Sequence, residues 1–162
     1  MKHSESVVAD TITELNRDLD PAQVLLRLED WRDRVHRLHD EIEKDLGRHY
    51  FYDRAGKHIT QEDIVQRAGL PQREVPPIDI LQIEGPHRRV LATIQPRYLW
   101  IIGANGRLDL LVTPKIGMGR RQFMLMDLSR PLAGESDWRL VSPAERLEQP
   151  RFTVNRLREL LE

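Results

Sequence analysis

Residues 20–47 read DPAQVLLRLEDWRDRVHRLHDEIEKDLG, and this stretch decides how the chain folds. Asp20 can cap the free amides of a helix, Pro21 suits the first helical position, and Gly47 is a common helix end. The sequence therefore predicts one long helix from residue 21 to about residue 46. Its apolar residues alternate between spacings of four and three, which is typical of a heptad seam. They are Val24, Leu28, Trp31, Val35, Leu38 and Ile42.

This seam is narrow and the rest of the predicted helix is charged, so the seam needs an apolar surface along its whole length. Residues 5–19 predict a first helix, which can cover part of the seam as an antiparallel hairpin but is several residues shorter. We therefore expect a dimer or higher oligomer, or a complex with another helical protein. The predicted interface residues are Leu28, Trp31, Val35, Leu38 and Ile42.

From Ile78 onward the pattern changes to short strands joined by short turns. We predict turns at Gly85-Pro86, Gln95-Pro96 and Asn105-Gly106, the last being a dipeptide favoured in tight hairpins. Such strands favour an antiparallel meander over a parallel sheet with crossover helices. The strands are expected near residues 78–84, 89–95, 98–103, 108–113, 122–127 and 138–141, followed by a helix near 153–161.

The expected fold class is α+β, with three parts along the chain. An N-terminal helical hairpin with coiled-coil character occupies residues 1–47, a connector 48–77, and a small antiparallel β-meander domain closed by a C-terminal helix 78–162. Within the connector, residues 59–70 resemble the first half of a helix-turn-helix element. Pro76 and Pro77 would stop the second helix after about one turn, so we interpret this segment as a capped connector helix.

Charge is divided unevenly between the two halves of the chain. Residues 1–84 carry 18 acidic and 12 basic residues, whereas residues 85–162 carry 8 acidic and 13 basic residues. The formal net charge of −1 therefore hides halves of −6 and +5. This division favours either attraction between the two halves or two subunits, or contact of the basic half with an anionic partner. The predicted contacts with an anion or nucleic acid are Arg88, Arg89, Lys115, Arg120 and Arg121, in two turns that also read as ordinary basic loops.

The composition excludes several kinds of site. The chain has no cysteine, which excludes disulfides, thiolate metal sites and cysteine nucleophiles. His36, His39 and Asp40 have the helical spacing of a metal site, but neighbouring arginines repel a cation, so we expect no metal and no cofactor.

No apolar run approaches the roughly 20 residues of a membrane helix, and no secretory signal is visible. We expect a cytoplasmic protein without membrane contact.

Catalytic motifs are weak in this sequence. None of its serines lies in a strand-turn-helix elbow with flanking glycines. Asp109 and Asp127 fit either an acid–base pair on neighbouring strands or the polar side of two ordinary strands. The sequence favours a non-enzymatic assembly subunit that oligomerises through its long helix and presents a basic β domain to a macromolecule. The alternatives are a nucleic-acid-binding accessory protein, and a hydrolase or nuclease of unrecognised type.

Overall fold

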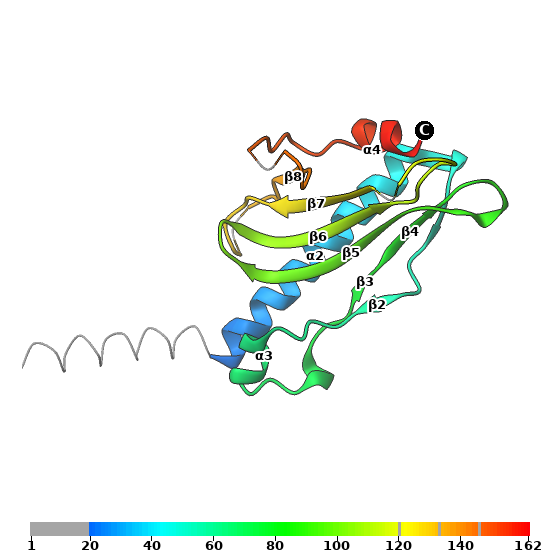
Figure 1. Cartoon of the computed structure of the whole chain (residues 1–162). Coiled ribbons are helices and arrows are strands. Elements are labelled where there is room, and N and C mark those ends of the chain that lie inside the picture. The colour runs from blue at the N-terminus through cyan, green and yellow to red at the C-terminus, as the bar shows by residue number, and fades with distance from the viewer. Residues whose placement is uncertain (1–19, 120, 133, 146) are drawn as a thin grey trace, which may run out of the picture.

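The computed structural model describes residues 20–162 except Arg120, Ala133 and Arg146. The helix expected over residues 5–19 lies outside this range. The fold is α+β, as predicted: a long helix, an antiparallel sheet and a C-terminal helix (Figure 1). The helices are α2 (Pro21–Leu46), α3 (Asp63–Arg67) and α4 (Val154–Leu161), with short 3-10 helices η1 (Gly47–His49), η2 (Gln72–Glu74) and η3 (Pro86–Arg88).

The strands form one large and one small sheet, with all neighbours antiparallel. The large sheet has the order β1-β4-β5-β6-β7-β8, in which β4 to β8 follow one another as the predicted meander. Its strands are β1 (Phe51–Asp53), β4 (Leu81–Glu84), β5 (Val90–Ile101), β6 (Ala104–Val112), β7 (Arg121–Asp127) and β8 (Trp138–Val141). The small sheet pairs β2 (Lys57–His58) with β3 (Ile78–Asp79).

Of the three predicted turns, Gly85-Pro86 is confirmed, since it lies between β4 and β5 where η3 begins, and the other two are wrong. Pro96 lies inside the continuous strand β5, where the register of pairing with β6 shifts between Pro96 and Tyr98. Proline is tolerated at such irregularities because it needs no partner for an amide hydrogen. The chain turns at Ile102 and Gly103, so Asn105 and Gly106 belong to β6.

Gly106 lies in a strand because α2 approaches the sheet closely at this point. Its φ is +108°, and a Cβ atom there would lie 2.6 Å from the indole Nε1 of Trp31. The backbone oxygen of the preceding residue, Asn105, accepts a hydrogen bond from Arg34 at 2.9 Å. The glycine that predicted a hairpin turn is therefore used for helix–sheet packing.

Helix α2 begins and ends as predicted. The side chain of Asp20 accepts a hydrogen bond from the amide of Ala22 at 3.0 Å, and Gly47 follows the last helical residue with a φ of +74°. The helix lies along one face of the large sheet, behind the strands in Figure 1. The opposite face of the sheet is the outer face.

The apolar seam of α2 lies in the core of its own chain, which corrects the expectation that it needs a second helix. The five predicted interface residues are at most 3% exposed, and they belong to one cluster with apolar residues of the sheet and α4. At about 1.5 Å per residue α2 is ~39 Å long, and at about 3.3 Å per residue β5 spans ~40 Å. The sheet is long enough to cover the helix. These five side chains, Leu28, Trp31, Val35, Leu38 and Ile42, offer no exposed seam to a partner.

One core draws on all three parts of the chain that the sequence suggested. It combines residues of α2, connector residues such as Val65 and Val75, and residues of the β region and α4. Residues 150–152 extend the sheet beyond β8, with amide hydrogen bonds between Leu140 and Pro150 and between Phe152 and Trp138. Within the described residues, no helix has the length and apolar character needed to cross a membrane.

Candidate functional site

The two basic turns that the sequence singled out lie at the same end of the sheet. Strands β4 and β6 end there, and β5 and β7 begin there, because successive strands of a meander run in opposite directions. This end lies to the right in Figure 1, close to α4 and the end of α2. We call it the basic end and define it by Arg88, Arg89, Lys115 and Arg121.

A pocket of about 470 Å³ opens at the basic end. Arg89, Lys115 and Arg121 contribute its cationic groups, and none of the described residues that line it is acidic. Its apolar lining comes from strands, the β6–β7 turn and α4: Leu91, Val112, Pro114, Ile116, Leu160 and Leu161. The pocket therefore combines an apolar interior with positive charge, the combination expected for a ligand that is itself both apolar and anionic.

The cationic side chains of this pocket have few partners within the described part of the chain. The Nη2 of Arg121 donates to the backbone oxygen of Leu160 at 2.9 Å, while its Nε is buried without a hydrogen-bond partner. Arg89 and Lys115 are exposed, and neither side chain forms a hydrogen bond or ion pair with another described residue. Their charges are thus not neutralised by acids within the described part of the chain.

Three of the five predicted contact residues line the pocket, and Arg88 does not. Arg88 lies over the ring of Phe51, 4.0 Å from its centroid, and its Nη1 is 3.8 Å from an oxygen of Glu84. Arg88 is therefore part of the basic end but already has a ring and an acid as neighbours. Arg120 lies outside the described residues.

Sequence reasoning missed the apolar side chains at the basic end. Ile116 is 98% exposed and Met118 is 54% exposed, both in the turn between β6 and β7. The signal was present in the sequence, since two large apolar residues alternate with glycines between Lys115 and Arg121. Neither reaches the core from the tip of a turn, so both are free to contact another molecule.

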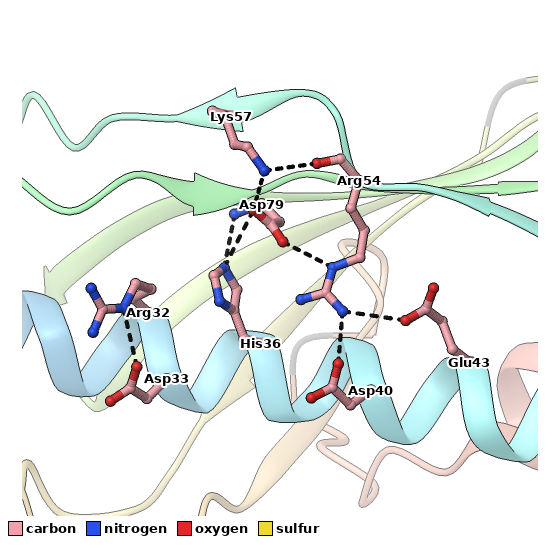
Figure 2. Close-up of polar contacts among 8 residues, drawn as sticks. All are labelled: Arg32, Asp33, His36, Asp40, Glu43, Arg54, Lys57 and Asp79. Carbon is pink, nitrogen blue, oxygen red and sulfur yellow. Dashed lines mark hydrogen bonds and ion pairs between the residues drawn. The ribbon is translucent and has the colours of Figure 1, made fainter.

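A second polar cluster ties α2 to the two-stranded sheet (Figure 2). The carboxylate of Asp79 accepts a hydrogen bond from Arg54 at 2.9 Å and one from Lys57 at 2.5 Å. Arg54 also contacts Asp40 at 2.7 Å and Glu43 at 3.2 Å, so one guanidinium joins three carboxylates. Burial alone would raise the pKa of Asp79, but the hydrogen bonds from Lys57 and Arg54 hold it below its usual value. The cluster is a structural clamp.

Two residues of the weak metal candidate, His36 and Asp40, are part of this clamp. The Nε2 of His36 accepts the amide hydrogen of Asp79 at 3.0 Å, and Asp40 pairs with Arg54. His39 is fully buried with no hydrogen-bond partner for either ring nitrogen, and burial together with nearby Arg54 lowers its pKa to about 3. Among the described residues, no group of three or more histidines and acids is placed to hold a metal ion.

Asp109 and Asp127 do not form an acid–base pair, because they lie on opposite faces of the sheet. Asp109 is on the outer face, where Arg97 at 2.7 Å and Arg107 at 3.0 Å bind its carboxylate. Asp127 faces α2, is fully buried and forms an ion pair with Arg34. Burial would raise the pKa of Asp127, but hydrogen bonds from the amides of Asp137 and Ser129 keep it low. Both carboxylates are held by the fold.

The chain was compared with known proteins at the level of families, curated sequences and solved structures. No family model, no curated protein and no solved structure matches it. The geometry of the basic end is therefore the basis for assigning a function.

Proposed function

We propose that this protein is a non-enzymatic interaction subunit that holds an acidic protein at its basic end. The observation that carries the proposal is the pocket in which Arg89, Lys115 and Arg121 line an apolar interior, with no acid among its described lining residues. Cationic groups without acidic partners attract an anionic surface and restrict which partners can dock.

The ion pairs that arginines form elsewhere in the fold support this proposal. Arg34 pairs with Asp127 and Arg54 with Asp79, and each of these pairs joins separate elements of the structure. At these two positions a carboxylate lies beside the arginine. Among the described residues that line the pocket there is no acid, which favours an acid supplied by a partner.

Nucleic acid is the second candidate, because phosphates are also held by arginine and lysine. The exposed apolar groups at the basic end favour protein over nucleic acid. Ile116 and Met118 are aliphatic, whereas single-stranded nucleic acids are bound through aromatic rings that stack on bases. The ring of Phe51 is already covered by Arg88.

The test is a pull-down from the native host with nuclease-treated lysate, comparing the wild-type chain with the double variant Arg89→Glu/Lys115→Glu. A matched control reverses two arginines far from the pocket along the chain, Arg67→Glu/Arg73→Glu. We expect the wild type and the control to retain an acidic protein that the pocket variant loses.

The same pull-down is repeated with untreated lysate, where retention of nucleic acid in place of an acidic protein would overturn the proposal. That outcome would be confirmed with purified protein and duplex DNA, where each phosphate contact contributes a log–log salt slope of about −0.9. Equal retention of the acidic protein by the pocket variant would also contradict it, since binding would then use another surface.

A further inference from the structure

The pocket itself indicates what kind of segment the partner presents. Its wall combines Leu91 and Val112 of the sheet with Leu160 and Leu161 of α4, while its charges come from the turn after β4, the turn after β6 and the start of β7. An all-acidic segment would leave the apolar wall in contact with water. An all-apolar segment would leave the three cations without a partner.

We infer that the pocket binds a short segment of the partner in which a large apolar side chain is flanked by acidic residues. The inference rests on the proposed function and specifies the motif it recognises. The apolar side chain enters the pocket, and the flanking carboxylates meet Arg89, Lys115 and Arg121. Arg89 and Lys115 come from two different turns, so acids on both sides of the apolar residue find a cation.

Size and surface agree with this assignment. A volume of about 470 Å³ lies in the range of sites that enclose a compact group, and burial of an apolar side chain there removes apolar surface of both molecules from water. Ile116 and Met118 stand beside it in the same turn as Lys115, and they add apolar contact for residues that follow the anchor. A lipid bilayer or a nucleic acid would use the charges without needing the pocket.

The experiment measures binding of three fluorescein-labelled decapeptides to the purified full chain by fluorescence anisotropy. The first has a central Leu-Phe pair between two runs of four glutamates. The second replaces the central pair with two serines, and the third replaces the glutamates with glutamines. We expect the first peptide to bind at least tenfold more tightly than either of the others.

Two kinds of variant separate the apolar contribution from the electrostatic one. Thr113→Phe places a ring in the pocket without changing charge, and it should remove the advantage of the first peptide over the second. Arg89→Glu/Lys115→Glu should weaken the first peptide at least tenfold and flatten its dependence on salt. Ile116→Ser changes a side chain that is 98% exposed, so its folding is safe, and a loss of about threefold is expected. Arg67→Glu/Arg73→Glu is the matched control and should bind like the wild type.

Each other outcome overturns the inference. Equal binding of the first and second peptides means that charge alone is recognised, which leaves the proposed acidic partner in place. Tighter binding of duplex DNA or of phosphatidylserine vesicles than of the first peptide, lost in the Arg89→Glu/Lys115→Glu variant, removes both the motif and the proposed function. No binding of any peptide removes the motif, and the pull-down then decides the proposed function independently.

Discussion

The charges along α2 and the charges at the basic end share the same chemistry but have opposite surroundings. Arg34 is 2% exposed and contacts Asp127 and Asp30, and Arg54 contacts three carboxylates. Arg89 and Lys115 have no acidic partner among the described residues. A buried charge is strongly destabilising unless it is paired, whereas an exposed charge costs little when it is not. The first group is therefore tied to the fold, and the second is available for binding.

The contrast between paired and unpaired charges can be tested by removing α2 from the chain. A fragment of residues 78–162 contains the basic end but lacks α2 and its charges. It should not fold, because its sheet would expose the face that α2 covers, including Leu108 and Leu110, which are fully buried in the whole chain. Circular dichroism and a thermal melt of the fragment test this. A cooperative melt would show that the β region stands without the paired charges of α2.

A single substitution at the centre of the paired region should have the next largest effect. Arg34→Met leaves the fully buried Asp127 without its cation, and we expect the free energy of unfolding to fall by about 3–5 kcal/mol. Urea denaturation measures the loss.

The double variant Arg34→Met/Asp127→Asn serves as the control for this prediction. Asparagine keeps an acceptor for the amides of Ser129 and Asp137 while removing the unpaired charge. Stability should recover in part relative to Arg34→Met alone. A double variant as unstable as the sum of the two single ones would mean that the ion pair is not what stabilises this contact.

The same region contains a group that must remain uncharged. The pKa of His39 is about 3 in the folded chain, against an ordinary value of 6.5, because the ring is buried and Arg54 is near. Below pH 6.5 the unfolded chain binds a proton that the folded chain does not, so stability is complete above that pH and falls as the pH approaches 3. At pH 5 this one histidine should cost about 2 kcal/mol.

Replacement of the ring tests the assignment. In His39→Leu, the fall in the free energy of unfolding between pH 7 and pH 5 should shrink by about 2 kcal/mol. His36 and His58, whose pKa values burial also lowers, contribute to the fall that remains. An unchanged pH profile would show that His39 is protonated in the folded chain.

The sequence predicted α2 and the basic end to different extents. The capping residues and the heptad spacing identified α2 and its buried side, because both are local properties of the chain. The spacing did not reveal what covers that side, since a sheet and a second helix demand the same apolar seam. The turn predicted at Asn105-Gly106 was wrong for a related reason. Glycine is suited both to a tight turn and to close packing of a helix on a strand, and only the position of Trp31 shows that Gly106 has the second role.

The basic end was predicted in part. Arg89, Lys115 and Arg121 were identified from composition and turn position, and the alternation of strand direction brings their turns to one end. The sequence could not predict the pocket between them, because its wall includes Leu160 and Leu161, which reach it only through the packing of α4. Nor could the sequence show that Arg88 is not part of the pocket. Its neighbours Phe51 and Glu84 come together only because β1 pairs with β4.

The smallest change in stability is expected at the basic end itself. There, stability and binding should respond to substitution in opposite ways from the paired charges of α2. Arg89→Glu/Lys115→Glu alters two exposed side chains without acidic partners, so the free energy of unfolding should change by less than about 0.5 kcal/mol, while binding of an acidic partner is lost. Arg34→Met should show the opposite pattern, with lower stability and unchanged affinity of the folded fraction. Urea denaturation and peptide anisotropy on the same preparations give both quantities. If the pocket variant were destabilised as strongly as Arg34→Met, these cations would have acidic partners within the fold, and their availability for binding would be refuted.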